Sequence, residues 1–169
     1  MNYFELFEIP VSLKVDAGSL AKKYFELQKK FHPDYYSNES TEVQAAILEK
    51  VAQINKAFKT FKNPDEIIKY VLMEKELLEE EEKYQLPPDF LMEMMDLNEQ
   101  LADAAMDGGE NLLLIKEGLA DTEAEIYLPV KLIIENYKEG ITSTEELLKV
   151  KEYYYKKKYL NRLKQQANL

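Results

Sequence analysis

Apolar residues recur at steps of three and four in several stretches of the chain, which is the spacing of one face of an α-helix. Two such stretches, 20–31 and 43–58, lie close together in the sequence. Asp16 suits the N-cap of the first helix, and Pro33 requires that helix to end before it, because proline disfavours helical geometry in the preceding residue. The two stretches therefore predict an antiparallel helical hairpin.

Further helices are predicted on both sides of this hairpin. Pro10 ends a short N-terminal helix, and Pro64 suits the first turn of a helix that follows the hairpin. Pro129 interrupts a long apolar-rich stretch and should kink or break it. The predicted helices of the second half occupy residues 88–107, 110–138 and about 142–166. The chain has only 5 glycines and 6 prolines against many leucines, glutamates, lysines and alanines, so the sequence predicts an all-α fold.

A change in composition near the middle of the chain predicts two domains. A run of glutamates and the pair Pro87-Pro88 separate the hairpin region from the later helices. We expect an N-terminal domain of residues 1–75, a hinge of residues 76–86, and a C-terminal three-helix-type bundle of residues 87–169.

The composition excludes several kinds of chemistry. The chain has no cysteine and one histidine, so disulfides, thiolate nucleophiles and multi-histidine metal sites are impossible. No calcium-binding loop spacing is visible. We therefore expect no cofactor and no metal. The N-terminus has no secretory signal and no apolar run is long enough for a membrane span, which predicts a cytoplasmic protein without a membrane partner.

The net charge of −10 is concentrated in the second half of the chain. Residues 1–75 hold 11 lysines and 11 acidic residues, whereas residues 76–169 hold 11 basic and 21 acidic residues. Such an acidic chain is a poor candidate for nucleic-acid binding, which depends on neutralising phosphates. A basic run at 149–164 is an exception, and it is interpreted as a solvated helix end whose cations suit the helix dipole.

The single histidine, His32, is followed by Pro33 and Asp34. It allows several interpretations: a general base, a metal ligand, a contact for a partner protein, or a loop residue without a role. No nucleophile or phosphate-binding glycine loop lies near it in the sequence. The preceding helix has four lysines on or beside its polar face: Lys22, Lys23, Lys29 and Lys30. A rigid charged loop after a basic helix favours partner recognition.

The helix predicted at 88–107 has more apolar residues than one buried face needs. Phe90, Met94 and Leu101 belong to a stripe that suffices to bury the helix in a bundle. Three apolar residues and three acids lie outside this stripe: Leu91, Met92, Met95, Asp96, Glu99 and Asp103. They indicate either a wide core face with solvated acids or a binding surface in which carboxylates orient a basic partner.

Several segments together resemble the HscB family, the J-domain co-chaperones of iron–sulfur cluster assembly. The segments are "NYFELFEIP", "LQKKFHPD", "INKAFKTFKNP" and "DFLMEMMDLNEQL". The resemblance implies a J domain at residues 1–75 and a scaffold-binding bundle after it. One departure is that many general J domains carry basic residues after the tyrosine of the second helix, where this chain has Phe25 and Glu26.

The resemblance implies a function and two sets of site residues. The chain would deliver an IscU-like iron–sulfur scaffold protein to a specialised, HscA-like chaperone of the DnaK type and stimulate its ATPase, without being an enzyme itself. The chaperone-binding residues would be Lys22, Lys23, Lys29, Lys30, His32, Pro33 and Asp34. The scaffold-binding residues would be Leu91, Met92, Met95, Asp96, Glu99, Asp103, and Tyr153 or Tyr154. The alternatives are a general J-protein that presents unfolded clients to a DnaK-type chaperone, and an enzyme that uses His32.

Overall fold

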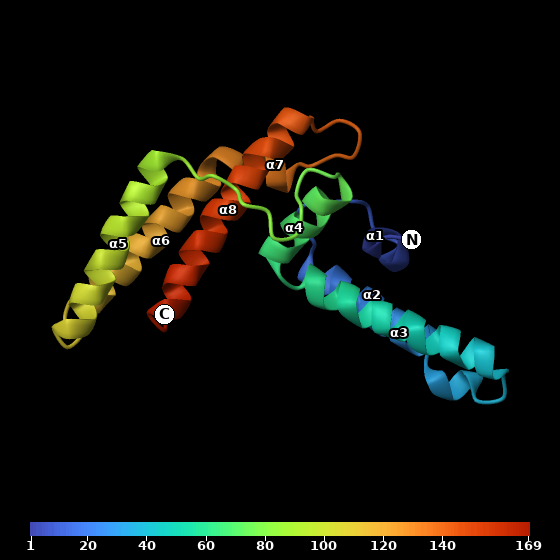
Figure 1. Cartoon of the computed structure of the whole chain (residues 1–169). Helices are drawn as coiled ribbons and strands as arrows, with labels where there is room; N and C mark the ends of the chain where they lie inside the picture. The colour runs from blue at the N-terminus through green and yellow to red at the C-terminus, as the bar shows by residue number, and fades with distance from the viewer. The chain divides into compact units, whose positions relative to one another are not determined.

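The computed structural model describes residues 1–169 and contains helices and no strands, as the sequence predicts. The chain divides into two compact units, Met1–Val71 and Leu72–Leu169. The helices that begin in the first unit are α1 (Tyr3–Phe7), α2 (Ala17–Lys30), the 3₁₀ helix η1 (Pro33–Tyr36), α3 (Thr41–Phe61) and α4 (Pro64–Glu74) (Figure 1).

The second unit holds three long helices and two short ones. They are α5 (Pro88–Met106), α6 (Leu112–Tyr127), the 3₁₀ helix η2 (Leu128–Val130), α7 (Lys131–Glu135) and α8 (Thr144–Gln166). The predicted interruption at Pro129 is confirmed, because the proline lies in η2 between α6 and α7. None of these helices has the length and apolar character needed to cross a membrane.

Helices α2 and α3 form the predicted hairpin. Both are capped by side chains: Asp16 accepts a hydrogen bond from the Ser19 N–H, and Ser40 accepts one from the Val43 N–H. The ring of Tyr24 stacks on that of Phe58 across the hairpin, with 3.9 Å between the centroids. These contacts hold the two helices in a fixed register, so the loop that joins them has a defined position at the end of the hairpin.

An aromatic cluster joins α1 to the base of the hairpin and to α4. Phe4 and Phe7 are buried and lie 4.9 and 5.3 Å from the ring of Phe61. Tyr3 stacks on Tyr70 at 4.5 Å, and the Tyr3 N–H donates a hydrogen bond to the Tyr70 hydroxyl. The base of the hairpin is therefore rigid, although the unit is small.

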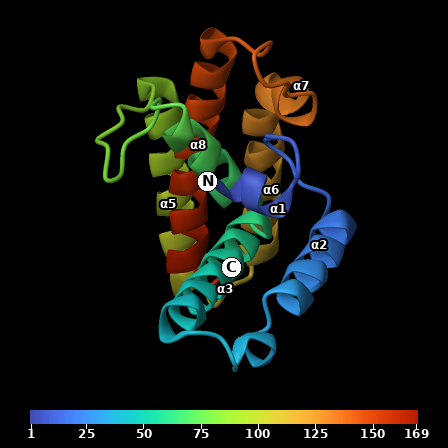
Figure 2. The same cartoon turned by 90° about the vertical axis from the view of Figure 1, so that its right-hand side faces the viewer.

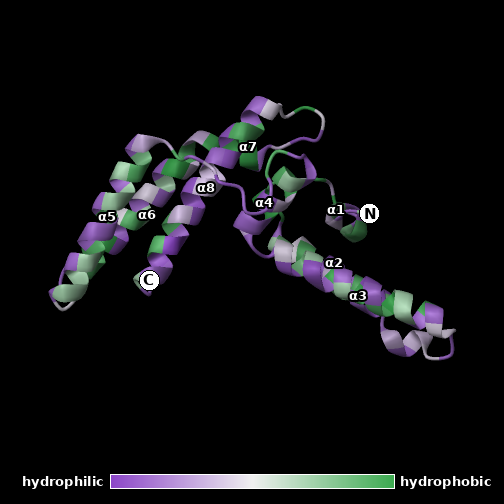
Figure 3. Ribbon diagram, in the orientation of Figure 1, coloured by the Kyte–Doolittle hydropathy of each residue, from purple (hydrophilic) through white to green (hydrophobic).

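The second unit is a bundle of α5, α6 and α8 around one apolar core. Helices α5, α6 and α8 all contact one another, and Figure 2 shows them side by side. The buried residues of the core are Phe90, Met94, Leu101, Ala104, Ile115, Leu119, Leu160 and Leu163. Figure 3 shows apolar and polar residues interleaved along these helices, as expected when one face of each is buried.

Lysines of α8 form ion pairs inside the unit. Glu123 of α6 lies 3.1 Å from the ammonium group of Lys157 and 2.7 Å from that of Lys164. Lys151 donates a hydrogen bond of 3.0 Å to Glu82. The basic run at 149–164 is thus only in part the solvated helix end that the sequence predicts, because three of its cations neutralise acids from other segments. Lys157 and Lys164 are seven residues apart, so one helix face presents both to Glu123.

Replacing Glu123 with glutamine should destabilise the second unit. Burial raises the pKa of this carboxyl, but hydrogen bonds from Lys164 and Lys157 outweigh it and lower the pKa below 4.5. The ion pairs of Glu123 with the two lysines then stabilise the fold above about pH 4.5. Their contribution is lost as the pH falls through the lowered pKa of Glu123. We expect a loss of about 1 kcal/mol at pH 7, since the site is partly exposed. Urea unfolding should show this difference shrink below pH 4.5, with exposed Glu125→Gln as the control.

The segment predicted as a hinge, 76–86, has no regular helix but packs within the second unit. Leu78 is buried in it, and Tyr84 stacks on Tyr155 with 4.5 Å between the ring centroids. The Tyr155 hydroxyl also donates a hydrogen bond of 3.1 Å to Glu82. The division between the units lies earlier, inside α4, between residues 71 and 72. The limits 1–75 and 87–169, and a hinge motion at 76–86, stay predictions.

Candidate functional site

His32 lies at the start of a single 3₁₀ turn, where the sequence predicts only a loop. Helix α2 ends at Lys30, before Pro33, and Pro33 begins η1 with a backbone angle that suits a first turn. The Asp34 N–H donates a hydrogen bond of 3.3 Å to Nδ1 of His32, and the Asp34 carboxylate lies 3.6 Å from the same atom. His32, Pro33 and Asp34 are all exposed. The turn therefore presents them in a fixed arrangement at the surface.

The surroundings of His32 favour contact with a partner over catalysis. Because Nδ1 accepts a hydrogen bond, Nε2 is the ring nitrogen left to donate one to a partner. The ring of Tyr35 lies 5.7 Å from that of His32 and is itself exposed. No group of three or more acidic or histidine side chains is placed to hold a metal ion. An exposed imidazole donor beside a carboxylate suits hydrogen bonding to another protein surface.

The four lysines of α2 are not equivalent. Lys22, Lys29 and Lys30 are exposed, and Lys30 lies 5.3 Å from the centroid of the Phe31 ring. Lys23 instead lies 3.0 Å from Glu8 of the first helical segment and 3.9 Å from Glu26. Its hydrogen bond to Glu8 lowers the pKa of that carboxyl. Lys23 is therefore partly neutralised within its own unit and contributes less positive potential than the other three.

The apolar and acidic residues outside the core stripe of α5 lie at the surface. Met92 and Met95 are each 66% exposed, whereas Met94 between them is fully buried. Leu91 is half-buried. The three acids, Asp96, Glu99 and Asp103, are exposed, and together with Leu91, Met92 and Met95 they form what we call the α5 strip. The two methionines are thus not part of a wide core face, which leaves the binding surface as the better interpretation of this strip.

The two candidate tyrosines of α8 are buried. Their part in scaffold binding stays a prediction, although Tyr153 is only 8% and Tyr154 only 6% exposed. The reason for their burial is helical register, because Val150 and Leu160 are also buried and place this part of α8 in the interior. Tyr153 lies 5.6 Å from the ring of Tyr127, and Tyr154 lies 5.1 Å from that of Tyr155.

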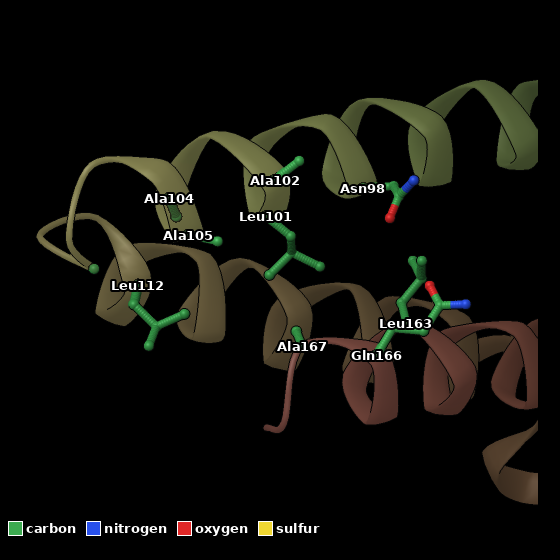
Figure 4. Close-up of a pocket in the computed structure, with 10 residues that line it drawn as sticks. Asn98, Leu101, Ala102, Ala104, Ala105, Leu112, Leu163, Gln166 and Ala167 are labelled. Carbon is green, nitrogen blue, oxygen red and sulfur yellow. The ribbon is translucent and has the colours of Figure 1, made fainter.

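A groove that the sequence does not reveal lies where α5, the start of α6 and the end of α8 meet (Figure 4). It has a volume of about 400 Å³. Asn98 and Leu101 of α5 face Leu163 and Gln166 of α8 across it. Its lining has no ionisable side chain, so it offers no acid, base or nucleophile for catalysis. Its apolar character suits contact with an apolar group.

Comparison with known proteins places the chain in a family. The co-chaperone protein HscB homologue of Photobacterium profundum is 34% identical over 149 residues, which cover 88% of this chain and 80% of that protein. The chain belongs to the HscB family. The co-chaperone protein HscB homologue of Vibrio parahaemolyticus is 33% identical, over 88% of this chain and 80% of that protein. A family model described as the HSCB C-terminal oligomerisation domain matches residues 86–168, which lie in the second unit.

Solved HscB structures have the same fold. Chaperone HscB from Vibrio cholerae has a TM-score of 0.78 and 26% identity, over 99% of this chain and 96% of that one. Human co-chaperone protein HscB has a TM-score of 0.80 and 25% identity, over 99% of this chain and 81% of that one. The predicted fold is therefore confirmed: an HscB-type chain with an N-terminal J domain and a C-terminal helical bundle. The hairpin α2–α3 with its His-Pro-Asp turn belongs to the J domain.

Proposed function

We propose that this HscB-family chain is a co-chaperone that brings an IscU-like iron–sulfur scaffold protein to an HscA-like chaperone of the DnaK type and stimulates its ATPase. The observation that carries the proposal is the presence of two different exposed surfaces on two separate units. One is the His32 turn with the lysines of α2, and the other is the methionine and acid strip of α5. One chain with two such surfaces is suited to hold two proteins at once.

Each surface fits one of the two proposed partners. The exposed cations of α2 suit an acidic chaperone surface, and His32 and Asp34 supply a donor and an acceptor next to it. On α5, Met92 and Met95 offer adaptable apolar area, and the neighbouring carboxylates suit a basic rim on the scaffold. The chain needs no cofactor for this role, since the nucleotide and the cluster belong to its partners.

Such an adaptor would raise the effective concentration of the scaffold at the chaperone. When the scaffold is bound to α5 and the chaperone to α2, the scaffold reaches the chaperone as part of one assembly and not by free diffusion. Stimulated hydrolysis then converts the chaperone to its ADP form while the scaffold is near its binding site. The two binding events are thereby coupled without any catalytic group in this chain. The predicted cytoplasmic location stays part of this proposal.

A competition between two clients tests the proposal. The purified chain is immobilised and offered the purified IscU-like scaffold or an unfolded polypeptide, each with and without the HscA-like chaperone and ATP. We expect capture of the scaffold and a ternary assembly with the chaperone. Equal capture of the unfolded polypeptide would support a general J-protein instead. If neither client is bound and hydrolysis is not stimulated, the proposed function is wrong.

Removing positive charge from α2 should weaken chaperone binding mainly at low salt. Changing Lys29 and Lys30 to glutamine should slow association about threefold to tenfold at 50 mM salt, because charge complementarity raises association rates. At 0.5 M salt the difference should nearly vanish, since charges are screened beyond roughly 10 Å already at 0.1 M. Stopped-flow association measures this. The control changes Lys56 and Lys59, two exposed lysines of α3, and removes the same charge from the other helix.

A further inference from the structure

One large apolar side chain lies on the outward face of α2. Phe25 is 64% exposed, although Leu20 and Leu27 of the same helix are buried against the rest of the unit. Its ring lies 6.1 Å from that of Tyr24 in a tilted arrangement, and Tyr24 is already stacked on Phe58. The hairpin is therefore closed without Phe25. The ring adds little to the stability of the unit and remains in contact with water.

Positively charged residues lie on the same face of α2 as Phe25. Lys22 lies three residues before it and Lys29 four residues after it, so helical spacing places one ammonium on each side of the ring. Both lysines are exposed. The same line along the helix leads to its end, where the turn of His32 begins. An exposed aromatic ring thus lies on the same helix face as two of the cations assigned to the chaperone-binding surface.

Cations and an aromatic ring contribute differently to an interface. Charges at the rim raise the association rate and orient the partner, but they add little short-range affinity while they remain hydrated. A buried aromatic side chain near the centre of an interface often accounts for much of the binding energy. Any acidic surface would attract the lysines of α2, whereas only a partner with an apolar recess would also bury the Phe25 ring.

We propose that Phe25 is the apolar anchor of the chaperone-binding surface and inserts into an apolar recess bordered by acidic residues on the DnaK-type partner. This inference rests on the proposed function and adds to it the residue that selects the partner. The lysines bring the two surfaces together, Phe25 holds them, and the His32 turn acts on the ATPase. A chaperone with acidic residues but no recess would be bound weakly.

The test is the chaperone ATPase rate measured against the concentration of the co-chaperone. The chain of residues 1–169 is titrated into the HscA-like chaperone of the same genome. Phe25→Ala should raise the concentration for half-maximal stimulation about 10-fold to 30-fold and leave the maximal rate unchanged, as expected for a lost anchor. Phe25→Leu, which keeps apolar area, should restore most of this loss. Leu48→Ala is the matched control, because Leu48 is 59% exposed on α3.

Each other outcome overturns the inference in a distinguishable way. If Phe25→Ala behaves like Leu48→Ala, Phe25 is not an anchor, while wild-type stimulation still supports the proposed function. A lowered maximal rate with unchanged half-maximal concentration would give Phe25 a part in activation instead of docking. If the wild-type chain does not stimulate the ATPase at all, both the proposed function and the inference are wrong. Circular dichroism and melting curves confirm that the variants are folded.

Discussion

Replacing His32 with glutamine is expected to abolish stimulation of the chaperone ATPase and to leave scaffold binding unchanged. In the wild-type turn, Nδ1 accepts the Asp34 N–H, and the opposite side of the ring presents Nε2–H to a partner. A glutamine amide carries its oxygen and nitrogen on one carbon, so it does not reproduce both interactions at the same positions. The turn would lose its cap or its outward donor. The measurement is the ATPase rate at saturating co-chaperone, which should fall to the unstimulated rate.

The fold should not change in this variant, because His32 is exposed and makes no core contact. Asn38→Ala is the control, since Asn38 is an exposed residue in the same connection between α2 and α3. It should stimulate like the wild type. Normal stimulation by His32→Gln would show that the histidine is a loop residue without a role. A loss of helicity would show instead that His32 has a structural role in the hairpin.

The helices could be predicted from the sequence because each has local boundary signals. Asp16 and Pro33 limit α2, Pro64 begins α4, and Pro129 separates α6 from α7. Such signals act through the backbone angles and hydrogen bonds of neighbouring residues, so they need no knowledge of distant contacts. The 3₁₀ turn at His32 was not predicted, although Pro33 fixes one backbone angle there, because a single turn leaves no periodic pattern to detect.

The candidate sites could be predicted only as far as one helix determines them. The α5 strip could be predicted because Met92 and Met95 lie outside the row of apolar residues that already suffices to bury the helix. The sequence does not distinguish Tyr153 from Tyr154, because three consecutive tyrosines give no hydrophobic contrast from which their orientation could be inferred. Ion pairs such as Lys23 with Glu8 and Lys164 with Glu123 depend on how separate segments pack, which no local spacing reveals.

Changing Leu91, Met92 and Met95 together to alanine is expected to weaken binding of the IscU-like scaffold by about 2–4 kcal/mol, the range of an interface hot spot. This corresponds to a rise in the dissociation constant of roughly 30-fold to 1,000-fold. The cause is loss of apolar contact area, since both methionines are largely exposed and Leu91 is half-buried. Titration calorimetry with the purified scaffold measures the constant, and chaperone binding through α2 should remain at the wild-type level.

Two control variants separate binding from stability. Leu113→Ala with Leu114→Ala removes apolar side chains that are 68% and 66% exposed on α6, and should leave scaffold affinity unchanged. Met94→Ala removes the fully buried methionine of α5 and should lower the free energy of unfolding by about 2–5 kcal/mol, because it leaves a cavity. The triple variant should melt close to the wild type. If it melts as early as Met94→Ala, the three residues stabilise the bundle, and the α5 strip is not the scaffold-binding surface.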